Sequence, residues 1–206
     1  VLVAKDWAGE MKKTPGDYLL WTDANLGALK TDVAIKRALH LEISLKNDSY
    51  EARATMKYAH TGKMNWRISR YRAYSRIYVP LGSKIIKVEG KYKNAKGVSG
   101  AYDQGQENGR QWFGAFVTVE PGQTGTLAFV YTLSPEITNQ AVLGKYDLLV
   151  QKQIGTIAPE LTLDLDFGKK LQTAVPDEAP GRAGDNKYIL ATDLRQDKLF
   201  KLEFER

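Results

Sequence analysis

Apolar and polar residues alternate along several stretches of this chain, which is the pattern of strands that bury one face. The clearest example is residues 111–133. In each half of this stretch every second residue is apolar: Phe113, Ala115, Val117 and Val119, then Leu127, Phe129, Tyr131 and Leu133. Pro121 and Gly122 lie between the halves and favour a turn. We therefore predict a hairpin of two core strands joined by a tight turn.

Similar alternation predicts strands along most of the chain. Residues 160–167 place Leu161, Leu163, Leu165 and Phe167 on one face and Thr162, Asp164 and Asp166 on the other. Residues 34–45 fit a helical and a strand period equally well, but the turn at 46–49 favours a hairpin over about 43–58. Further strands are expected at 18–21, 67–79, 84–89, 145–152, 188–192 and 198–204. This spacing predicts an all-β, mainly antiparallel fold, a single β-sandwich domain over 1–206, immunoglobulin-like or related.

Other segments lack a strand pattern. Residues 1–16 form a helical or irregular lead-in, and 22–32 form a loop or a capped helical turn. Residues 134–143 contain Pro135 and are expected to be a loop. Glycine- and proline-rich composition predicts two long surface loops, at 90–109 and 168–187.

Composition sets broad limits on function. The chain has 206 residues, 43% of them hydrophobic and 26% charged, as in ordinary globular proteins. It has no apolar run long enough to span a membrane. The absence of cysteine excludes disulfides, thiol catalysis and cysteine-ligated zinc. The chain begins without methionine, which suggests a fragment of a larger protein.

Positive charge is concentrated in one segment. Residues 57–96 contain eleven Lys or Arg and one acid, Glu89, although the whole chain carries only +6. Such a segment suits an anionic partner, and it also suits a solvated face that the acidic remainder of the chain balances.

The basic segment contains a distinctive strand at 66–80. If this strand is extended, one face carries Arg70, Arg72, Tyr74, Arg76 and Tyr78, and the core face carries Tyr71, Ala73, Ser75, Ile77 and Val79. Guanidinium groups bind phosphate or carboxylate, and aromatic rings stack on sugars or bases. Lys84, Lys87, Lys91 and Lys93 would extend the field. The alternative is a solvent-facing strand whose arginines pair with acids such as Asp164 and Asp166.

No other chemistry is nominated. His40 and His60 have no evident catalytic partner, and no G-x-S-x-G, EF-hand or phosphate-binding motif occurs. Asp103 with Glu107, like Asp164 with Asp166, is expected to be solvated. We expect no catalytic residue, metal or cofactor, although a carboxylate pair for glycoside hydrolysis stays open because such pairs meet only in three dimensions. The 22–32 loop is either a structural turn or a contact with an upstream domain.

Four stretches resemble the C-terminal part of a bacterial family, domain of unknown function 4012. They are DYLLWTDANLGALKTD (17–32), YSRIYVPLG (74–82), FGAFVTVEPGQTGTLAFVYTL (113–133) and KYDLLVQKQIGT (145–156). Members of that family are membrane-anchored, outward-facing proteins whose upstream segment is similar to wall-polymer phosphotransferases. The resemblance implies an extracellular location at the cell envelope and an accessory β-domain, with no catalytic residue here.

Three functions follow as expectations. The first is a non-catalytic envelope module that supports or positions a larger protein, with the upstream domain as its partner. The second is a binding module in which the basic strand takes an anionic glycan, wall polymer or lipid headgroup, with nucleic acid disfavoured. The third is an accessory part of an enzyme that transfers envelope polymer.

Overall fold

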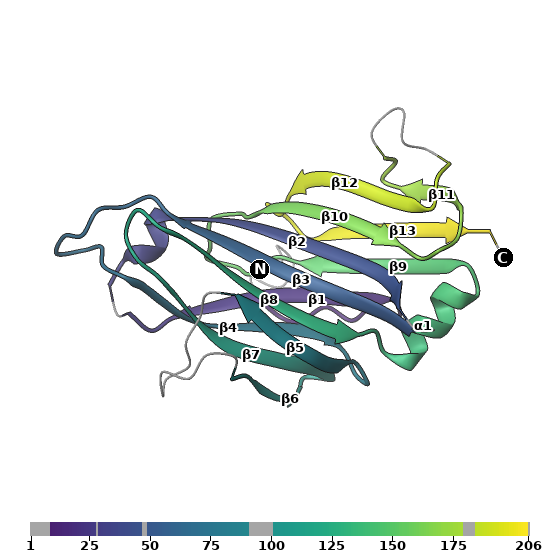
Figure 1. Cartoon of the computed structure of the whole chain (residues 1–206), viewed down its shortest axis with the longest axis horizontal. Helices are drawn as coiled ribbons and strands as arrows, with labels where there is room; N and C mark the ends of the chain where they lie inside the picture. The colour runs from purple at the N-terminus through teal and green to yellow at the C-terminus, as the bar shows by residue number, and fades with distance from the viewer. Residues whose placement is uncertain (1–8, 28, 47–48, 91–100, 179–183, 206) are drawn as a thin grey trace.

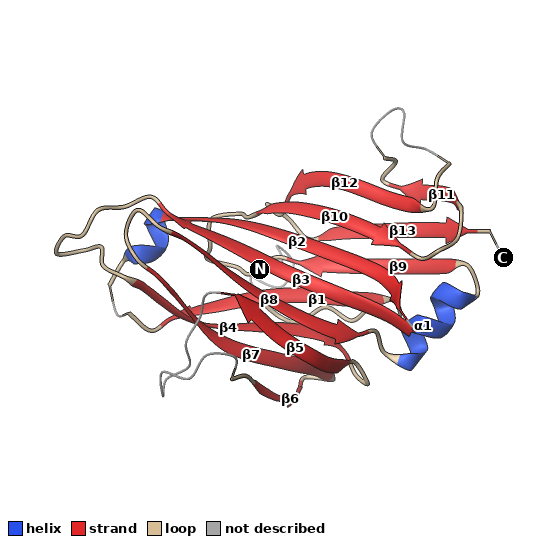
Figure 2. Ribbon diagram, viewed as in Figure 1, coloured by secondary structure: helices blue, strands red, loops and turns tan. Residues whose placement is uncertain are grey.

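In a computed structural model the chain forms two β-sheets packed face to face, described for residues 9–27, 29–46, 49–90, 101–178 and 184–205 (Figures 1 and 2). The first sheet has the strand order β11 (Leu171–Val175), β13 (Lys198–Phe204), β9 (Lys145–Gln151), β1 (Asp17–Asn25), β4 (Tyr71–Pro80), β7 (Arg110–Val119), β6 (Asp103–Glu107). The second has the order β12 (Lys187–Asp193), β10 (Glu160–Asp166), β2 (Ile35–Lys46), β3 (Ser49–His60), β8 (Thr124–Thr132), β5 (Lys84–Gly90). The predicted all-β sandwich is confirmed.

Pairing is mainly antiparallel, as expected. The exceptions among the described strands are β1 with β9 and β2 with β10, which run parallel. Because parallel neighbours need a crossover, each of these pairs joins segments far apart in the sequence. The C-terminal strands β9 and β10 therefore lie beside the N-terminal strands β1 and β2.

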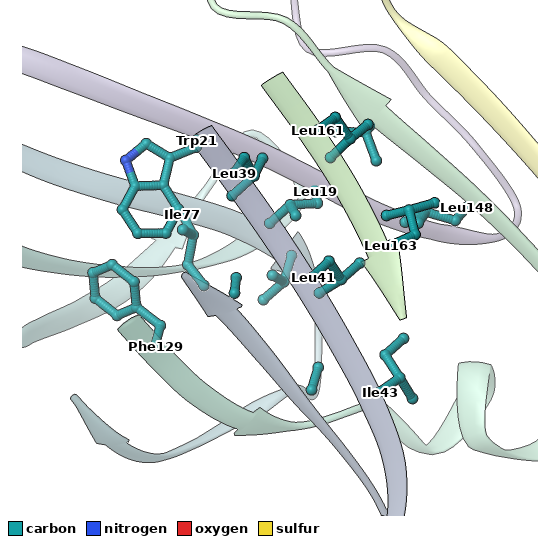
Figure 3. Close-up of a cluster of buried hydrophobic side chains, with 14 of the residues drawn as sticks. Leu19, Trp21, Leu39, Leu41, Ile43, Ile77, Phe129, Leu148, Leu161 and Leu163 are labelled. Atoms are coloured by element: carbon teal, nitrogen blue, oxygen red, sulfur yellow. The ribbon is translucent and has the colours of Figure 1, made fainter. Parts of the chain in front are cut away.

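One hydrophobic core fills the space between the sheets. It includes Leu19, Leu41, Ile77, Leu148 and Leu163, which point toward one another from both layers (Figure 3). The alternating residues of 113–119 and 127–133 all lie in this core, as predicted. Burying a large apolar side chain contributes about 2 kcal/mol, so this alternation is the main driving force for the sandwich.

The predicted hairpin at 111–133 is wrong in one respect. Both strands exist, as β7 and β8, but β7 pairs with β4 and β6 whereas β8 pairs with β3 and β5. The turn between them therefore carries the chain from one sheet to the other. Alternation shows which face is buried but not which neighbour a strand pairs with, so a hairpin and a crossing turn look alike in sequence.

The hairpin predicted near 43–58 is confirmed and is longer than expected. β2 and β3 pair antiparallel from Ile35 with His60 to Lys46 with Ser49. The helical alternative for 34–45 is wrong, because cross-strand packing decides a segment whose local pattern fits both periods.

Residues 134–143 are not the predicted loop, because α1 (Pro135–Val142) forms there. The Ser134 hydroxyl accepts a hydrogen bond from the Ile137 amide at 3.4 Å and caps the helix. Pro135 stands in the first turn, where a missing N–H costs nothing, so the proline starts this helix and does not break it. Ile137 and Ala141 anchor it to the core. No helix in the described ranges has the length and apolarity to cross a membrane.

Several predicted boundaries also change. β6 lies within the predicted loop 90–109, and β11 lies within the predicted loop 168–187. Both are short strands at a sheet edge, so their sequences carry little alternation. The rest of those loops includes 91–100 and 179–183, which lie outside the described residues.

The N-terminal boundaries differ as well. β1 continues through Thr22–Asn25, where a loop was predicted, and β4 begins only at Tyr71. A 3-10 helix, η2 (Thr31–Ala34), begins at the end of the segment 22–32, for which a capped helical turn was the alternative to a loop, but no side chain caps it. Residues 9–16 of the lead-in are irregular, which matches one of its two predicted forms, and residues 1–8 lie outside the described residues.

Candidate functional site

The basic strand β4 divides into the two predicted faces. Its core face is completely buried at Tyr71, Ala73, Ser75, Ile77 and Val79. Its outer face presents Arg72, Tyr74 and Arg76 at the surface. Strand alternation therefore placed these side chains correctly.

Two predicted members of the ladder have different surroundings. Arg70 precedes the strand and forms an ion pair with Glu120. The ring of Tyr78 is buried against Tyr18 and Leu20 in a small apolar cluster on the outer side of the first sheet, while its hydroxyl lies 3.5 Å from Arg76 Nη1 and 3.4 Å from a carboxylate oxygen of Glu107. The outer row therefore consists of the exposed Arg72 and the half-buried Tyr74 and Arg76.

Arg76 is held by aromatic rings as well as by an acid. Its guanidinium carbon lies 4.1 Å from the ring centroid of Trp112 and 5.3 Å from that of Tyr74. Its Nη1 lies 3.5 Å from a carboxylate oxygen of Glu107. The predicted pairing with neighbouring acids thus holds for Arg76, but the acid comes from β6. Asp164, which was named in that prediction, lies in the other sheet, where its Oδ1 is 3.7 Å from Lys187 Nζ.

Two glycines make room for the aromatic side chains. A Cβ atom on Gly114 would lie 2.5 Å from the Tyr74 hydroxyl, and one on Gly105 would lie 2.8 Å from the Trp112 ring. Each ring therefore packs directly against the backbone of the neighbouring strand, at a position where glycine has no side chain. We call the group Tyr74, Arg76, Trp112 and Phe116 the outer stack.

The outer stack has one strong polar contact. The Tyr74 hydroxyl donates to Asp103 at 2.8 Å, and the Phe116 ring centroid lies 4.8 Å from that of Tyr74. Partial burial, together with the Asp103 carboxylate, raises the pKa of Tyr74 to about 12. At neutral pH the stack therefore presents one guanidinium, a neutral phenol and two further aromatic rings.

Lys84 and Lys87 do not join this surface. They are exposed on β5, at an edge of the second sheet, whereas β4 belongs to the first. Lys87 forms an ion pair with Glu89 on its own strand. The prediction that they extend the field around the arginines is wrong, because sequence proximity says nothing about which sheet a strand enters. Lys91 and Lys93 lie outside the described residues.

A second constellation, missed by sequence reasoning, is buried in the core. One carboxylate oxygen of Asp23 accepts hydrogen bonds from the Trp21 indole at 3.1 Å, the Tyr58 hydroxyl at 2.8 Å and the Ser75 hydroxyl at 2.7 Å. The other accepts from Arg37 Nε at 2.9 Å. We call this group, with Tyr71, the Asp23 cluster.

Arg37 completes the Asp23 cluster. Its Nη2 donates to the Tyr71 hydroxyl and to Asp32, both at 2.8 Å. The side chains of Arg37 and Asp23 are only 4% and 2% exposed. Burial alone would lower the pKa of the guanidinium, but its interactions with Tyr71 and Asp23 outweigh burial and raise it. Arg37 is therefore a permanent buried cation.

The cavity beside the Asp23 cluster is small. It measures about 20 Å³ and is lined by Trp21, Asp23, Arg37, Leu39, Met56, Gln153, Thr156, Pro159 and Leu194. That is room for one water molecule. A carboxylate, a guanidinium and hydroxyls also occur together in active sites, but a cavity of this size admits no substrate.

A third buried group, Asp17, lies at the other end of β1. Its carboxylate accepts from the Tyr146 hydroxyl at 2.6 Å and from the Tyr18 amide at 2.7 Å. Burial raises the pKa of Asp17 to about 6, against the lowering effects of these two hydrogen bonds and of Arg110. This carboxyl therefore changes charge near neutral pH.

The two histidines form no hydrogen bond or ion pair with Asp23 or Asp17 among the described contacts. His60 is buried, its Nε2 lies 2.8 Å from the Ser69 carbonyl, and its Nδ1 accepts from the Gly62 amide at 3.2 Å. It fixes the loop that follows β3. His40 lies 3.9 Å from Glu42 at the surface. Across the described residues, no three His, Asp or Glu side chains gather closely enough to hold a metal ion.

The sequence did contain a signal for the Asp23 cluster. The inward register of Leu19 and Trp21 continues to Asp23, and the register of Leu39 and Leu41 runs back to Arg37. Opposite charges on the inward faces of two predicted strands indicate a buried ion pair. That signal was hidden because residues 22–32 were predicted to be a loop.

No known family model matches this chain, and no curated protein is detectably similar to it in sequence. The resemblance to domain of unknown function 4012 therefore remains a prediction. Among solved structures, native leukotriene A4 hydrolase from Saccharomyces cerevisiae is 8% identical with a TM-score of 0.43, and 82% of this chain covers 28% of that one. An M1 zinc metallopeptidase from Deinococcus radiodurans is 11% identical with a TM-score of 0.30, and 82% of this chain covers 41% of it. At these values the likenesses support no inference about function.

Proposed function

We propose that the chain is a non-catalytic β-sandwich module on the extracellular face of a bacterial envelope protein, which it supports or positions. The main support is that the polar groups of the Asp23 cluster are already hydrogen-bonded to one another within the core. Asp23 already receives four hydrogen bonds from the core, and the adjacent cavity admits one water. Groups with every bond satisfied stabilise a core, whereas a reactive group needs a free position facing a substrate. The envelope setting rests on the family resemblance.

This proposal is tested by separating stability from activity. The purified chain is incubated with chromogenic ester, phosphoester and glycoside substrates, and its unfolding is followed by urea titration. We expect no turnover, and we expect Asp23→Asn to lower the free energy of unfolding. Turnover that Asp23→Asn removes, while a surface control such as Arg53→Met retains it, would overturn the proposal.

A second candidate function is binding of an anionic polymer by Arg72 and the outer stack. Arg72 is exposed, and no acidic partner for it occurs among the described residues. The ion pair of Arg76 with Glu107 is exposed and contributes about 0.5 kcal/mol, so a multivalent polyanion can replace it. The aromatic rings beside Arg76 would then contact the sugars of a wall polymer.

Polymer binding is measured as retention on immobilised polyphosphate and on an acidic polysaccharide at increasing salt. We expect the double substitution Arg72→Ala with Arg76→Ala to lower the salt concentration needed for elution. A matched double substitution on the other sheet, Lys84→Ala with Lys87→Ala, should change it less. Equal effects would mean that only net charge matters, and the assignment to the outer stack would be rejected.

The remaining alternative is an accessory part of an enzyme that transfers envelope polymer. Comparing the transfer activity of a parent protein with and without this module would separate it from the first proposal. Loss of turnover with unchanged polymer retention would favour the enzyme accessory.

A further inference from the structure

Two loops at one end of the sandwich expose large apolar side chains. They comprise the described residues of 26–34 and all of 61–70, and we call them the tip. Trp66 is 83% exposed, Val33 70%, Met64 66% and Leu26 60%. Figure 1 shows the tip at one end of the long axis, with α1 and the C-terminus at the opposite end. Side chains of this size normally drive burial, so their exposure together needs an explanation.

The tip is well ordered by its own hydrogen bonds. The Lys30 amide donates to the Arg67 carbonyl at 3.0 Å, and the Thr61 amide donates to the Ala34 carbonyl at 2.8 Å. A Cβ atom on Gly62 would lie 2.9 Å from both Ala34 and Ile68, so the two loops are in close contact. These contacts join the two loops, and the exposed apolar side chains project outward from them.

Asn65 and His60 shape the second loop. The Asn65 side chain accepts from the Arg67 amide at 2.8 Å and from the Ile68 amide at 2.9 Å, which forms a tight turn around Trp66. The two ring nitrogens of His60 bind the backbone at Gly62 and Ser69. These bonds use the polar groups of the loop internally and leave Trp66 and Met64 on its outside.

The charges around the tip are predominantly basic. Lys30, Lys63 and Arg67 are exposed, and within the described part of the chain none of them pairs with an acid. The guanidinium carbon of Arg67 lies 5.3 Å from the ring centroid of Trp66. The acid of these loops, Asp32, is bound by Arg37 and by the Asn25 side chain. The tip thus combines protruding apolar groups with uncompensated positive charge.

This combination matches the chemistry of an anionic membrane surface. Tryptophan prefers the boundary between headgroups and acyl chains, where its ring is apolar and its N–H stays hydrated. Lysine and arginine beside it attract anionic headgroups, and short apolar insertions add to that attraction. A second copy of the tip would bring like charges together, which opposes self-association through this surface.

We propose that the tip docks peripherally on anionic bilayers, with Trp66 and Met64 entering the headgroup region and Lys30, Lys63 and Arg67 contacting the headgroups. The sandwich then stands end-on, with α1 and the C-terminus directed away from the lipid. This surface is separate from the outer stack, so the proposal does not depend on polymer binding.

Vesicle flotation of the whole chain tests the proposal. Vesicles of phosphatidylcholine alone are compared with an equal mixture of phosphatidylcholine and phosphatidylglycerol. We expect binding to the anionic vesicles, weakened by salt. The double substitution Trp66→Ala with Met64→Ser should reduce partitioning by about tenfold or more. Lys63→Ala with Arg67→Ala should reduce it by about 25-fold, since each charge near the surface contributes about a factor of five.

Matched controls come from the opposite end of the molecule. Val142→Ser with Leu143→Ala removes apolar side chains of 55% and 70% exposure, and Lys145→Ala with Lys201→Ala removes two exposed charges. Both should leave partitioning unchanged. Thermal unfolding of every variant shows that the fold is retained, because all these residues lie at the surface.

The contrary outcomes are distinct. Equal binding to neutral and anionic vesicles, or equal loss with the control substitutions, would overturn the proposal. If the chain binds no vesicles but forms a concentration-dependent dimer that Trp66→Ala dissociates, the tip would be identified as a self-association surface instead. Quenching of tryptophan fluorescence by brominated lipid should be largely lost in Trp66→Phe, and unchanged quenching would also count against insertion of this residue.

Discussion

The two ends of β1 each bury an aspartate, and the two carboxyl groups are held in opposite ways. Asp17 and Asp23 project from the same face of one strand into the core, where Asp17 is 1% exposed and the side chain of Asp23 is 2% exposed. The Asp23 carboxylate accepts hydrogen bonds from one cation, Arg37, and from three neutral donors. The Asp17 carboxylate accepts hydrogen bonds from a phenol and a backbone amide, and the charge of Arg110 acts on it without a hydrogen bond.

This difference shows that burial alone does not determine the charge of a carboxyl group. Taking a carboxylate out of water favours its protonated form unless an opposite charge and hydrogen bonds compensate. At Asp17 the compensation is incomplete, and burial raises its pKa to about 6. At Asp23 the Arg37 guanidinium supplies the missing charge. One end of the strand therefore holds a buried ion pair, and the other holds a carboxyl whose pKa is raised by burial.

Removing the cation from the Asp23 end should have the largest effect. Arg37→Met keeps the length of the side chain but leaves Asp23 buried without a counter-charge. We expect the free energy of unfolding at neutral pH, measured by urea titration, to fall by about 3–5 kcal/mol.

The control for this variant is Arg53→Met on the neighbouring strand. Arg53 is 38% exposed and pairs with Glu42 and Glu89. Its replacement should cost less than about 1 kcal/mol. A cost for Arg37→Met as small as that of the control would mean that the ion pair is solvated, and the contrast between the two ends would disappear.

Neutralising Asp17 should alter the pH dependence of stability. Well below the unfolded pKa of about 4, the carboxyl is protonated in both the folded and the unfolded chain. As pH rises toward 6 the unfolded chain ionises first, so the folded state loses stability, by up to about 3 kcal/mol in total. Asp17→Asn cannot titrate, so its free energy of unfolding relative to the parent chain should rise across this range.

Asp23→Asn is the corresponding variant at the other end of β1. That variant leaves Arg37 without its partner and should be less stable than the parent at neutral pH. Urea titrations from acid to neutral pH give the measurement for both variants. A constant difference between Asp17→Asn and the parent across the range would show that Asp17 does not titrate there.

The smallest effect concerns the tyrosine hydroxyls. Tyr146→Phe removes one of the two donors to Asp17 and should cost about 2 kcal/mol at neutral pH. It should also raise the pKa of Asp17 further, because this hydrogen bond lowers it. The Tyr58 hydroxyl also lies 3.0 Å from Trp21 Nε1 and 3.1 Å from Ser75 Oγ. Both of these groups still donate to Asp23 in Tyr58→Phe, so that change should cost about 1 kcal/mol. Thermal or urea unfolding gives both values, and a greater loss for Tyr58→Phe would contradict this ranking.

Much of the fold was readable from local pattern. Alternation identified most strands and the buried face of β4, β7, β8 and β10, because side chains on successive residues of a strand must point to opposite sides. It failed at α1, which is too short for a helical period, and at the edge strands β6 and β11, which have few core positions to fill.

The candidate surface was predicted only in part. The row Arg72, Tyr74 and Arg76 follows from the strand period. Its neighbours Trp112 and Glu107 come from other strands, so no local pattern could supply them. Lys84 and Lys87 were wrongly included for the same reason, since their strand enters the other sheet.

Side-chain periodicity and turn residues act over short distances, and they were enough to predict a β-sandwich with an Arg- and Tyr-bearing strand at its surface. Long-range contacts set which strands pair, where 111–133 crosses between the sheets, and how Asp23 contacts Arg37. They also brought the loops of the tip together. These features depend on contacts between residues far apart in the chain, whose partners are chosen only when the two sheets close on one core.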